Sequence, residues 1–329
     1  MIRFGVIGTN WITESFIDAA RQVRGVEVAA VYSRTEERAA EFAARHGIPH
    51  PFADLEQFAA SREWDAVYIA SPNSFHAAQA IVCMDNGKHV LCEKPVASNA
   101  AELRQMIEAA RRNGVVFMEA MKSTLMPNFA AVREHLHKIG KVRRYFASFC
   151  QYSSRYDAYK AGALPNAFNP EFSNGALMDL GTYCLYPLVV LFGKPVTISA
   201  SGVMLGSGVD GEGAMLLSYG EMDAVVMYSK ITDSSLPAEI QGEAGNIVIG
   251  KISRPEKVEL KYRGGRTEEL TRPQAENTMV YEIEEFAGLI RSGKQESPTN
   301  SWAASLAVME IMDEARRQIG LVFPADRNR

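Results

Sequence analysis

The sequence is poor in the features that mark disulfide-rich, zinc-binding and membrane-spanning proteins. The four cysteines among its 329 residues are Cys83, Cys92, Cys150 and Cys184. They are widely spaced and form no Cys-x-x-Cys pair, which argues against zinc and disulfide frameworks and predicts buried, reduced thiols. The apolar run Leu185–Phe192 contains Pro187 and is too short to cross a bilayer. We therefore expect no metal and no membrane span.

The charge distribution excludes a further class of partners. The chain has 35 basic and 39 acidic residues, a net charge of −4, and its pI is near 6.0. It has no basic stripe of the kind that binds nucleic acid. A strand-like run begins at Ile2, which leaves no room for a signal peptide. These observations predict a soluble, cytoplasmic protein that binds a small molecule, with no nucleic acid or membrane partner.

The first part of the chain predicts an α/β domain. Over residues 1–120, short apolar runs such as Val26–Tyr32 and Ala66–Ala70 alternate with amphipathic stretches such as Glu36–Arg45. This rhythm is typical of parallel strands covered by helices, so we expect a doubly wound parallel sheet, a Rossmann domain.

The remainder, residues 121–329, predicts a second, α+β domain. Its β-rich runs are Val142–Tyr152, Val196–Leu205, Ala214–Tyr219, Ala224–Ile231 and Asn246–Ile249. Glycine turns and long intervals without helix separate these runs, which favours a large, mostly antiparallel sheet. Helices are expected again over 280–290 and 303–318.

A candidate phosphate loop follows the first strand. The segment begins Gly8-Thr9-Asn10-Trp11-Ile12 and runs into a helix expected from about Thr13. Against the pattern G-x-G-x-x-G, only the glycine at position 8 is retained. The segment is either a nucleotide loop, whose backbone N–H groups and helix N-terminus face a pyrophosphate, or a simple strand–helix turn. The βαβ rhythm that follows favours the nucleotide loop.

The end of the second strand bears on the choice between NAD and NADP. An acidic residue there usually binds the ribose hydroxyls of NAD. Here Ser33 and Arg34 take that place, and Arg38 follows one turn later. These residues favour NADP because a cation can meet the 2′-phosphate, although NAD stays possible. Alternatively, both arginines solvate the start of a helix.

Two further strand ends carry polar groups that can reach a ligand. Ser71, Pro72, Asn73 and His76 lie where a strand gives way to a helix, and Glu93-Lys94 follows the fifth predicted strand. Carboxyl ends of parallel strands line the ligand crevice of such a sheet. His76 as a helix-capping or surface residue, and Lys94 in a surface salt bridge, are the structural alternatives.

Far along the chain, Asp179 and Tyr183 are four positions apart. On a helix they share one face. Their alternative role is packing of that helix against the sheet. Arg155 stands in a polar segment, residues 153–157, which is either a substrate loop or a turn at the domain junction.

Taken together, these motifs resemble the Gfo/Idh/MocA family of oxidoreductases over nearly the whole chain. Tyr183 stands at the usual histidine position, so the pattern is most similar to the dihydrodiol dehydrogenase and glucose–fructose oxidoreductase branch and less similar to inositol dehydrogenase. The resemblance implies that Glu93 binds the nicotinamide ribose and that Asn73 and His76 lie near it. It implies that Lys94, Asp179 and Tyr183 form the catalytic group.

The leading hypothesis is an NAD(P)-dependent dehydrogenase acting on CH–OH groups of a sugar, polyol or cyclic diol. Tyr183 would exchange the proton, Lys94 would polarise the reacting oxygen, and Asp179 would position Tyr183 or a substrate hydroxyl. Lys94, Arg155, Asp179 and Tyr183 would contact substrate. A non-catalytic dinucleotide sensor is the alternative. The second sheet has few helices left to cover it, so we expect a homodimer or higher homo-oligomer.

Overall fold

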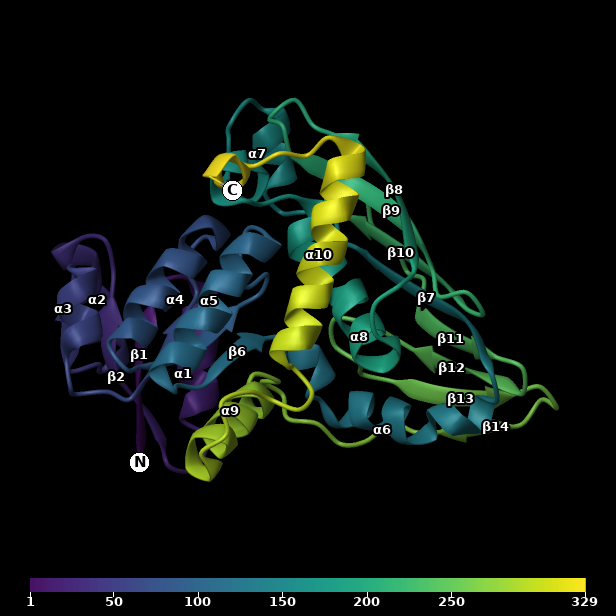
Figure 1. The fold of residues 1–329 in the computed structure, drawn as a ribbon, viewed down its shortest axis with the longest axis horizontal. Coiled ribbons are helices and arrows are strands. Elements are labelled where there is room, and N and C mark those ends of the chain that lie inside the picture. The colour runs from purple at the N-terminus through teal and green to yellow at the C-terminus, as the bar shows by residue number, and fades with distance from the viewer. Residues whose placement is uncertain (329) are drawn as a thin grey trace. The chain divides into compact units, whose positions relative to one another are not determined.

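The computed structural model describes residues 1–328 and divides them into two compact units. One unit contains Met1–Lys122 together with Ala275–Trp302, and the other contains Ser123–Gln274 together with the rest of the chain from Ala303. The predicted division at residue 120 places 275–302 in the second domain, whereas the structure packs this segment with the first. Figure 1 shows the elements of both units.

The first unit is built on a six-stranded parallel sheet. Its strands are β1 Ile2–Ile7, β2 Val26–Tyr32, β3 His50–Phe52, β4 Ala66–Ile69, β5 His89–Glu93 and β6 Phe117–Ala120. Their order is β3-β2-β1-β4-β5-β6, with every neighbouring pair parallel. The helices are α1 Trp11–Ala20, α2 Glu36–His46, α3 Leu55–Ala60, α4 His76–Asp85, α5 Ala100–Asn113 and α9 Val280–Ser292. The predicted Rossmann sheet is confirmed.

Local sequence signals explain where the helices begin and end. The Asn99 side chain accepts the Glu102 N–H at 3.0 Å at the start of α5, and Gly114 ends that helix in a left-handed conformation. Thr35 and Gly47 bound α2 in the same way. Helix α1 begins at Trp11, two residues before the predicted start, because Asn10 is its N-cap.

The segment 275–302 joins the first unit through both backbone and core contacts. Phe286 of α9 lies 5.7 Å from Phe4 of β1, between ring centroids, and both are fully buried. The indole nitrogen of Trp302 donates to the carbonyl of Phe117 at 2.9 Å, at the edge strand β6. These contacts complete the core and cover the edge of the parallel sheet.

The second unit contains an eight-stranded sheet. Its strands are β7 Val142–Cys150, β8 Thr197–Met204, β9 Asp210–Ser218, β10 Asp223–Ser229, β11 Ala238–Gly242, β12 Gly245–Ile249, β13 Val258–Tyr262 and β14 Thr267–Glu269. The order is β14-β13-β12-β11-β7-β10-β9-β8. Within the described part of this eight-stranded sheet, only β10 and β7 pair in parallel. The mostly antiparallel sheet is confirmed, and it also contains β11, β13 and β14, which the sequence pattern did not single out.

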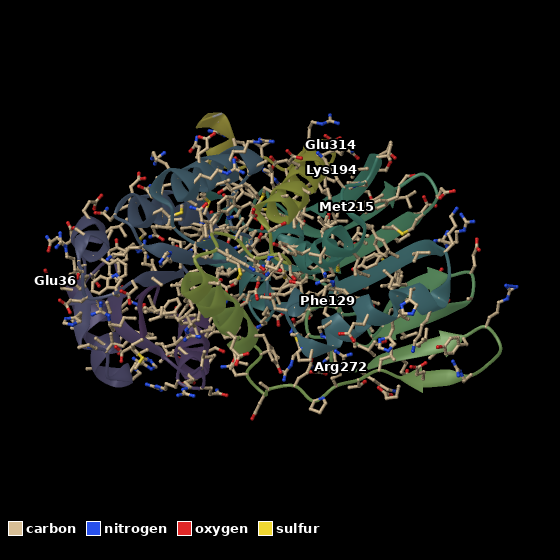
Figure 2. The ribbon with its side chains drawn as sticks, turned by 60° about the horizontal axis from the view of Figure 1, so that its bottom comes forward. Glu36, Phe129, Lys194, Met215, Arg272 and Glu314 are labelled. Atoms are coloured by element: carbon tan, nitrogen blue, oxygen red, sulfur yellow. The ribbon has the colours of Figure 1, made fainter. Side chains whose placement is uncertain are left out.

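One face of this sheet packs against helices. They are α6 Pro127–His135, α8 Thr182–Phe192 and α10 Trp302–Ile319 (Figure 1). Phe129, labelled in Figure 2, is the buried anchor of α6. Lys194, just after α8, pairs with Glu310 of α10. Figure 2 labels Lys194 and Glu314, which lies one turn after Glu310 in α10. A further short helix, α7 Tyr156–Lys160, follows β7 in the sequence.

The opposite face of the sheet exposes apolar side chains. Leu216 is 52% exposed and Met227 37% exposed, whereas Met215, the neighbour of Leu216 in β9, is buried. Successive residues of a strand point to opposite faces, so the exposed residues share the face away from the helices. Val203 of β8 is also exposed.

The structure bears on two predictions made from composition, namely the state of the cysteines and the absence of a membrane span. Cys83, Cys92 and Cys184 are buried free thiols, whereas Cys150 is only half-buried. One helical stretch, Pro170–Phe192, is long and apolar enough to cross a membrane, but 72% of its apolar window is buried inside the structure. A core helix passes the same test, so this is weak evidence for a span.

Candidate functional site

The phosphate loop depends on a glycine at its first position. Gly8 has a φ of +107°, and a Cβ there would lie 2.8 Å from the carbonyl oxygen of Ala70. Any other residue would therefore be strained and would clash with backbone. The loop passes close to the end of β4 without a side chain in the way, as a loop that approaches a pyrophosphate must.

Asn10 replaces the second glycine of the fingerprint and has a structural role. Its Oδ1 accepts the N–H groups of Ile12 and Thr13, at 3.1 and 3.2 Å. Its Nδ2 donates to the carbonyl of Ala70 at 2.7 Å. The first N–H groups of α1 are thus partly satisfied by Asn10, and the amide of Ile12 is engaged within the protein. Trp11, next to it, is 69% exposed.

The end of β2 lies beside this loop. The amide of Gly8 donates to the carbonyl of Tyr32 at 3.3 Å. In the first turn of α2, the Arg38 Nε donates to the Thr9 hydroxyl at 2.7 Å. Ser33 is buried and Arg34 exposed. Arg34 and Arg38 therefore place two cations at the same edge of the sheet as the glycine loop.

The loop after β4 is fixed by a buried histidine. His76 is 1% exposed, and its two ring nitrogens lie 2.8 Å from the carbonyl of Ser71 and 3.0 Å from that of Pro95. Burial lowers its pKa to about 4, while the contacts with the carbonyls of Ser71 and Pro95 act in the opposite direction and the charge of Lys94 in the same one. A neutral ring has one N–H and donates to one of the two carbonyls, so His76 lies between the Ser71-Pro72-Asn73 turn and the segment after β5. His76 is buried, not a surface residue.

The end of β5 carries Glu93 and Lys94, both half-buried. Glu93 accepts a hydrogen bond from the buried Tyr68 hydroxyl at 2.6 Å. Burial and the carboxylate of Glu93 raise the pKa of Tyr68 well above its usual value. Tyr68 is stacked on Phe16, 3.9 Å between centroids, which fixes its ring. The hydroxyl of Tyr68 thus orients the carboxylate next to Lys94.

A second carboxyl lies in the same region of the first unit. Glu282 of α9 is fully buried, and neither of its carboxyl oxygens has a hydrogen-bond partner among residues 1–328. Its pKa is raised well above 4.5, first by burial and then by the charge of Glu93, while Lys122 opposes the shift. Burial therefore favours the neutral carboxylic acid of Glu282 over its carboxylate.

In the second unit, Asp179 and Tyr183 lie on consecutive helical segments. Asp179 is in a π-helical turn, Leu177–Gly181, and Tyr183 follows in the first turn of α8. Such turns are rare and occur often at functional sites. The Tyr183 ring meets Phe149 of β7 edge-on, 5.6 Å between centroids. Asp179 pairs with the buried Lys230, Oδ2 to Nζ, at 2.9 Å.

Arg155 stands outside these networks in the described structure. It is exposed and precedes α7, and its backbone N–H donates to the Ser153 hydroxyl at 3.3 Å. Among its neighbours, Asp157 bonds to the Tyr152 hydroxyl at 2.7 Å and pairs with Lys160. The segment is thus an ordered polar turn with one exposed guanidinium.

The structure brings the predicted cofactor residues of the first unit to one edge of one sheet. Gly8, Ser33, Ser71 and Lys94 each follow a parallel strand, namely β1, β2, β4 and β5. Three further residues were not singled out in the sequence: Tyr68, Glu282 and Lys230. A tyrosine inside an apolar strand and a glutamate inside an amphipathic helix give no local signal of burial. Lys230 directly follows an apolar strand, and this was the one available hint.

Comparison with known proteins accounts for both units. Residues 2–121 match the model of the Gfo/Idh/MocA oxidoreductase family, described as an NAD-binding Rossmann fold. Residues 129–248 match the model of the family's C-terminal domain. The chain belongs to the Gfo/Idh/MocA family. The resemblance inferred from Glu93-Lys94 and Asp179 to Tyr183 is thereby confirmed.

Similar members of the Gfo/Idh/MocA family extend over the full length of the chain. Scyllo-inositol 2-dehydrogenase (NADP(+)) IolU of Bacillus subtilis is 57% identical over 327 residues, covering 99% of this chain and 100% of that protein. Trans-1,2-dihydrobenzene-1,2-diol dehydrogenase of Mus musculus is 33% identical, covering 99% of each. Both are named as dehydrogenases of cyclic substrates that carry hydroxyl groups.

Solved structures also match across nearly the whole chain. KijD10, a 3-ketoreductase from Actinomadura kijaniata in complex with NADP and TDP-benzene, has a TM-score of 0.85 and 24% identity, covering 97% of this chain and 98% of that one. Levoglucosan dehydrogenase, in complex with NADH and levoglucosan, has a TM-score of 0.85 and 20% identity, covering 97% of each. At these identities the likeness establishes the fold.

Proposed function

We propose that this protein is an NADP-dependent dehydrogenase that oxidises a ring hydroxyl of a cyclic polyol or a related sugar or diol, or reduces the corresponding ketone. The observation that carries the proposal is the 57% identity, over 99% of the chain, to a scyllo-inositol 2-dehydrogenase that uses NADP. The edge of the parallel sheet supports it, since the glycine loop and two arginines lie there together.

The dinucleotide would bind along the carboxyl edge of the parallel sheet. The Gly8–Trp11 loop would face the pyrophosphate, with Asn10 holding the loop in shape. Ser33, Arg34 and Arg38 would meet the adenosine ribose and its 2′-phosphate. The amide of Ile12 already donates to Asn10. Ile12 would therefore help to position helix α1 and would not bind the pyrophosphate directly.

The nicotinamide end would lie near the loops that follow β4 and β5. Glu93, oriented by the Tyr68 hydroxyl, would bind the nicotinamide ribose. Asn73 would lie beside the same ribose, and His76 would hold its loop from behind with Ser71 and Pro72. When bound, the nicotinamide supplies or accepts the hydride.

The catalytic groups would be Lys94, Tyr183 and Asp179. Tyr183 would take the proton from the substrate hydroxyl during oxidation and return it during reduction. Lys94 would donate a hydrogen bond to the same oxygen and stabilise the negative charge that develops on it. Asp179 would orient Tyr183 or a neighbouring substrate hydroxyl. Arg155, exposed and ahead of α7, would contact the far side of the substrate.

The second unit would serve both substrate binding and assembly of a homodimer in the cytoplasm. The exposed apolar residues Val203, Leu216 and Met227 support assembly, because covering exposed apolar side chains lowers the free energy. Light scattering at micromolar concentration should show a mass near twice that of the 36.2 kDa chain. Leu216→Lys should shift it towards the monomer; a monomeric wild type would reject this part of the proposal.

Turnover of scyllo-inositol with NADP⁺ is the direct test of the activity. Absorbance should show formation of the reduced cofactor. The same assay tests other inositols, sugars and cyclic diols, and NAD⁺ is tested in parallel with NADP⁺. Tight binding of NADP⁺ without turnover of any of these compounds would instead support a dinucleotide sensor. Failure to bind either dinucleotide would reject both functions.

A further inference from the structure

Lys230 is a buried cation that contacts the proposed catalytic segment of the second unit. It directly follows β10 and is 3% exposed. Its ammonium lies 2.9 Å from Oδ2 of Asp179 and donates to the carbonyl of Ala167 at 3.2 Å. It also lies over the ring of Phe168, 5.4 Å from the centroid. One side chain therefore joins Asp179 to the loop that precedes it by about ten residues.

A second buried charged residue, Asp210, fixes the backbone at the start of the π-helical turn. The Asp210 carboxylate, fully buried at the start of β9, accepts the N–H groups of Ala176 and Leu177 at 3.1 and 2.7 Å. A Cβ at Gly175 would lie 2.1 Å from Oδ1 of Asp210, so only glycine fits there. The backbone that leads into the π-helical turn is thus bound to β9 by hydrogen bonds.

Tyr228, two residues before Lys230, fills the space beneath the turn. A Cβ at Gly181 would lie 3.1 Å from the Tyr228 ring, and a Cβ at Gly213 would lie 2.4 Å from its hydroxyl. Tyr228 lies against Gly181 and Lys230 pairs with Asp179, so both residues contact the turn. The end of β10 therefore contacts the turn twice, once with a ring and once with a charge.

Burial of the Lys230 ammonium opposes folding, because the charge loses its hydration. Removing a cation from water costs several kcal/mol, and an apolar residue of similar volume often serves stability equally well. Asp179 is different, because its side chain is 36% exposed and can reach a ligand. A buried cation paired with a partly exposed carboxylate fixes the position of that carboxylate.

We propose that Lys230 is a positioning residue for the reaction: it holds the Asp179 carboxylate in its working position on the π-helical turn. This inference rests on the proposed function, since it assigns Asp179 to the site. Lys230 acts through Asp179 and touches neither substrate nor cofactor.

The first test needs no substrate. Urea unfolding is measured for wild type, Lys230→Met, Asp179→Asn and the double variant. Each single change removes the Lys230–Asp179 ion pair, so both should lower the unfolding midpoint. The double variant should be more stable than the sum of the two losses predicts. Additive losses would overturn the pairing. If Lys230→Met does not fold, an unchanged midpoint for Asp179→Asn would overturn it equally.

The second test measures kcat/KM for scyllo-inositol with NADP⁺ in the same four proteins. Lys230→Met should lower kcat/KM about 10- to 100-fold in the wild-type background and less than about threefold in the Asp179→Asn background. Lys230→Arg, which keeps the charge, should restore activity to within about tenfold of wild type. The dissociation constant of NADP⁺ should be unchanged in all of them, because its proposed residues lie in the other unit.

Lys194→Met is the matched control, since Lys194 forms an exposed pair with Glu310 in the same unit. It should leave kcat/KM unchanged. If the losses from Lys230→Met and Asp179→Asn multiply, Lys230 acts independently of Asp179 and the inference is rejected. If wild type binds NADP⁺ but turns over none of the compounds, the proposed function fails first and the positioning role fails with it. The unfolding measurements still show whether the ion pair exists.

Discussion

The side chain of Asn10 ties two strands of the parallel sheet together. Its Nδ2 donates to the carbonyl of Ala70, which follows β4, at 2.7 Å, while its Oδ1 caps the helix that follows β1. A glycine, the residue of the usual fingerprint, could make neither bond. The departure at position 10 thus exchanges backbone freedom for a fixed loop.

Asn10→Gly should therefore destabilise the protein although it restores the fingerprint. Loss of the cap and of the bond to Ala70 should lower the free energy of unfolding by about 1–2 kcal/mol. Asn10→Ser, which keeps a capping oxygen, should lose less. Urea unfolding compares the three proteins, and an Asn10→Gly variant as stable as wild type would show that the cap contributes nothing.

Arg34→Ala should weaken NADP binding much more than NAD binding. A charge-assisted bond to the 2′-phosphate contributes roughly 1.5–3 kcal/mol, or about ten- to a hundredfold in affinity. Calorimetry with both dinucleotides measures the two losses. Arg45→Ala is the control, because Arg45 is an exposed arginine in the last turn of α2, the helix that follows Arg34. Equal losses for NADP and NAD would mean that Arg34 does not read the phosphate.

Tyr183→Phe should lower kcat about 100- to 10,000-fold with cofactor affinity nearly unchanged, because the proton is lost and the ring against Phe149 is kept. Lys94→Met should be comparably impaired, and the double variant little worse than either, if the two act as a unit. Tyr219→Phe, elsewhere in the second unit, is the control. A folded Tyr183→Phe enzyme with normal kcat, measured where chemistry limits turnover, would remove Tyr183 from the mechanism.

The buried His76 should make the protein sensitive to mild acid. Its pKa is lowered from 6.5 to about 4 by burial, so the unfolded chain takes up a proton first. Stability is thus lost as the pH falls from about 6.5 to about 4, by about 3 kcal/mol for this group. Unfolding of His76→Gln should depend less on pH over that range, whereas the exposed control His137→Gln should follow wild type. Identical pH dependence in His76→Gln would exclude His76 as the cause.

Glu282 should have the opposite effect, so that its contribution to stability falls as the pH rises. Its pKa is raised by burial, so above about pH 4.5 the unfolded chain ionises while the folded chain stays protonated. The stability contributed by the neutral acid is therefore lost as the pH rises. Glu282→Gln should raise the Tm relative to wild type at pH 8 and change it little at pH 4. A Tm difference that is the same at both pH values would show that Glu282 is ionised in the folded protein.

Local sequence determined much of the first unit. The alternation of apolar runs and capped helices predicted its parallel strands, and β2 has the predicted bounds, Val26–Tyr32. Hydrophobic periodicity, caps and terminal glycines act over a few residues, so they can be read from the sequence. The same reasoning gave the strand ends after which Gly8, Ser33, Ser71 and Lys94 lie, because the carboxyl ends of parallel strands meet at one edge.

Contacts between residues distant in sequence were decided only by the tertiary structure. The return of 275–302 to the first unit depends on Phe286 meeting Phe4, and no local pattern encodes a partner that distant. The burial of His76 and Glu282, which sets their pKa values, is likewise a property of the packed core. Lys230 meets Asp179 because β10 lies beneath the turn that carries Asp179. Protonation and ion pairing depend on the surrounding dielectric and charges, which exist only once the chain is folded.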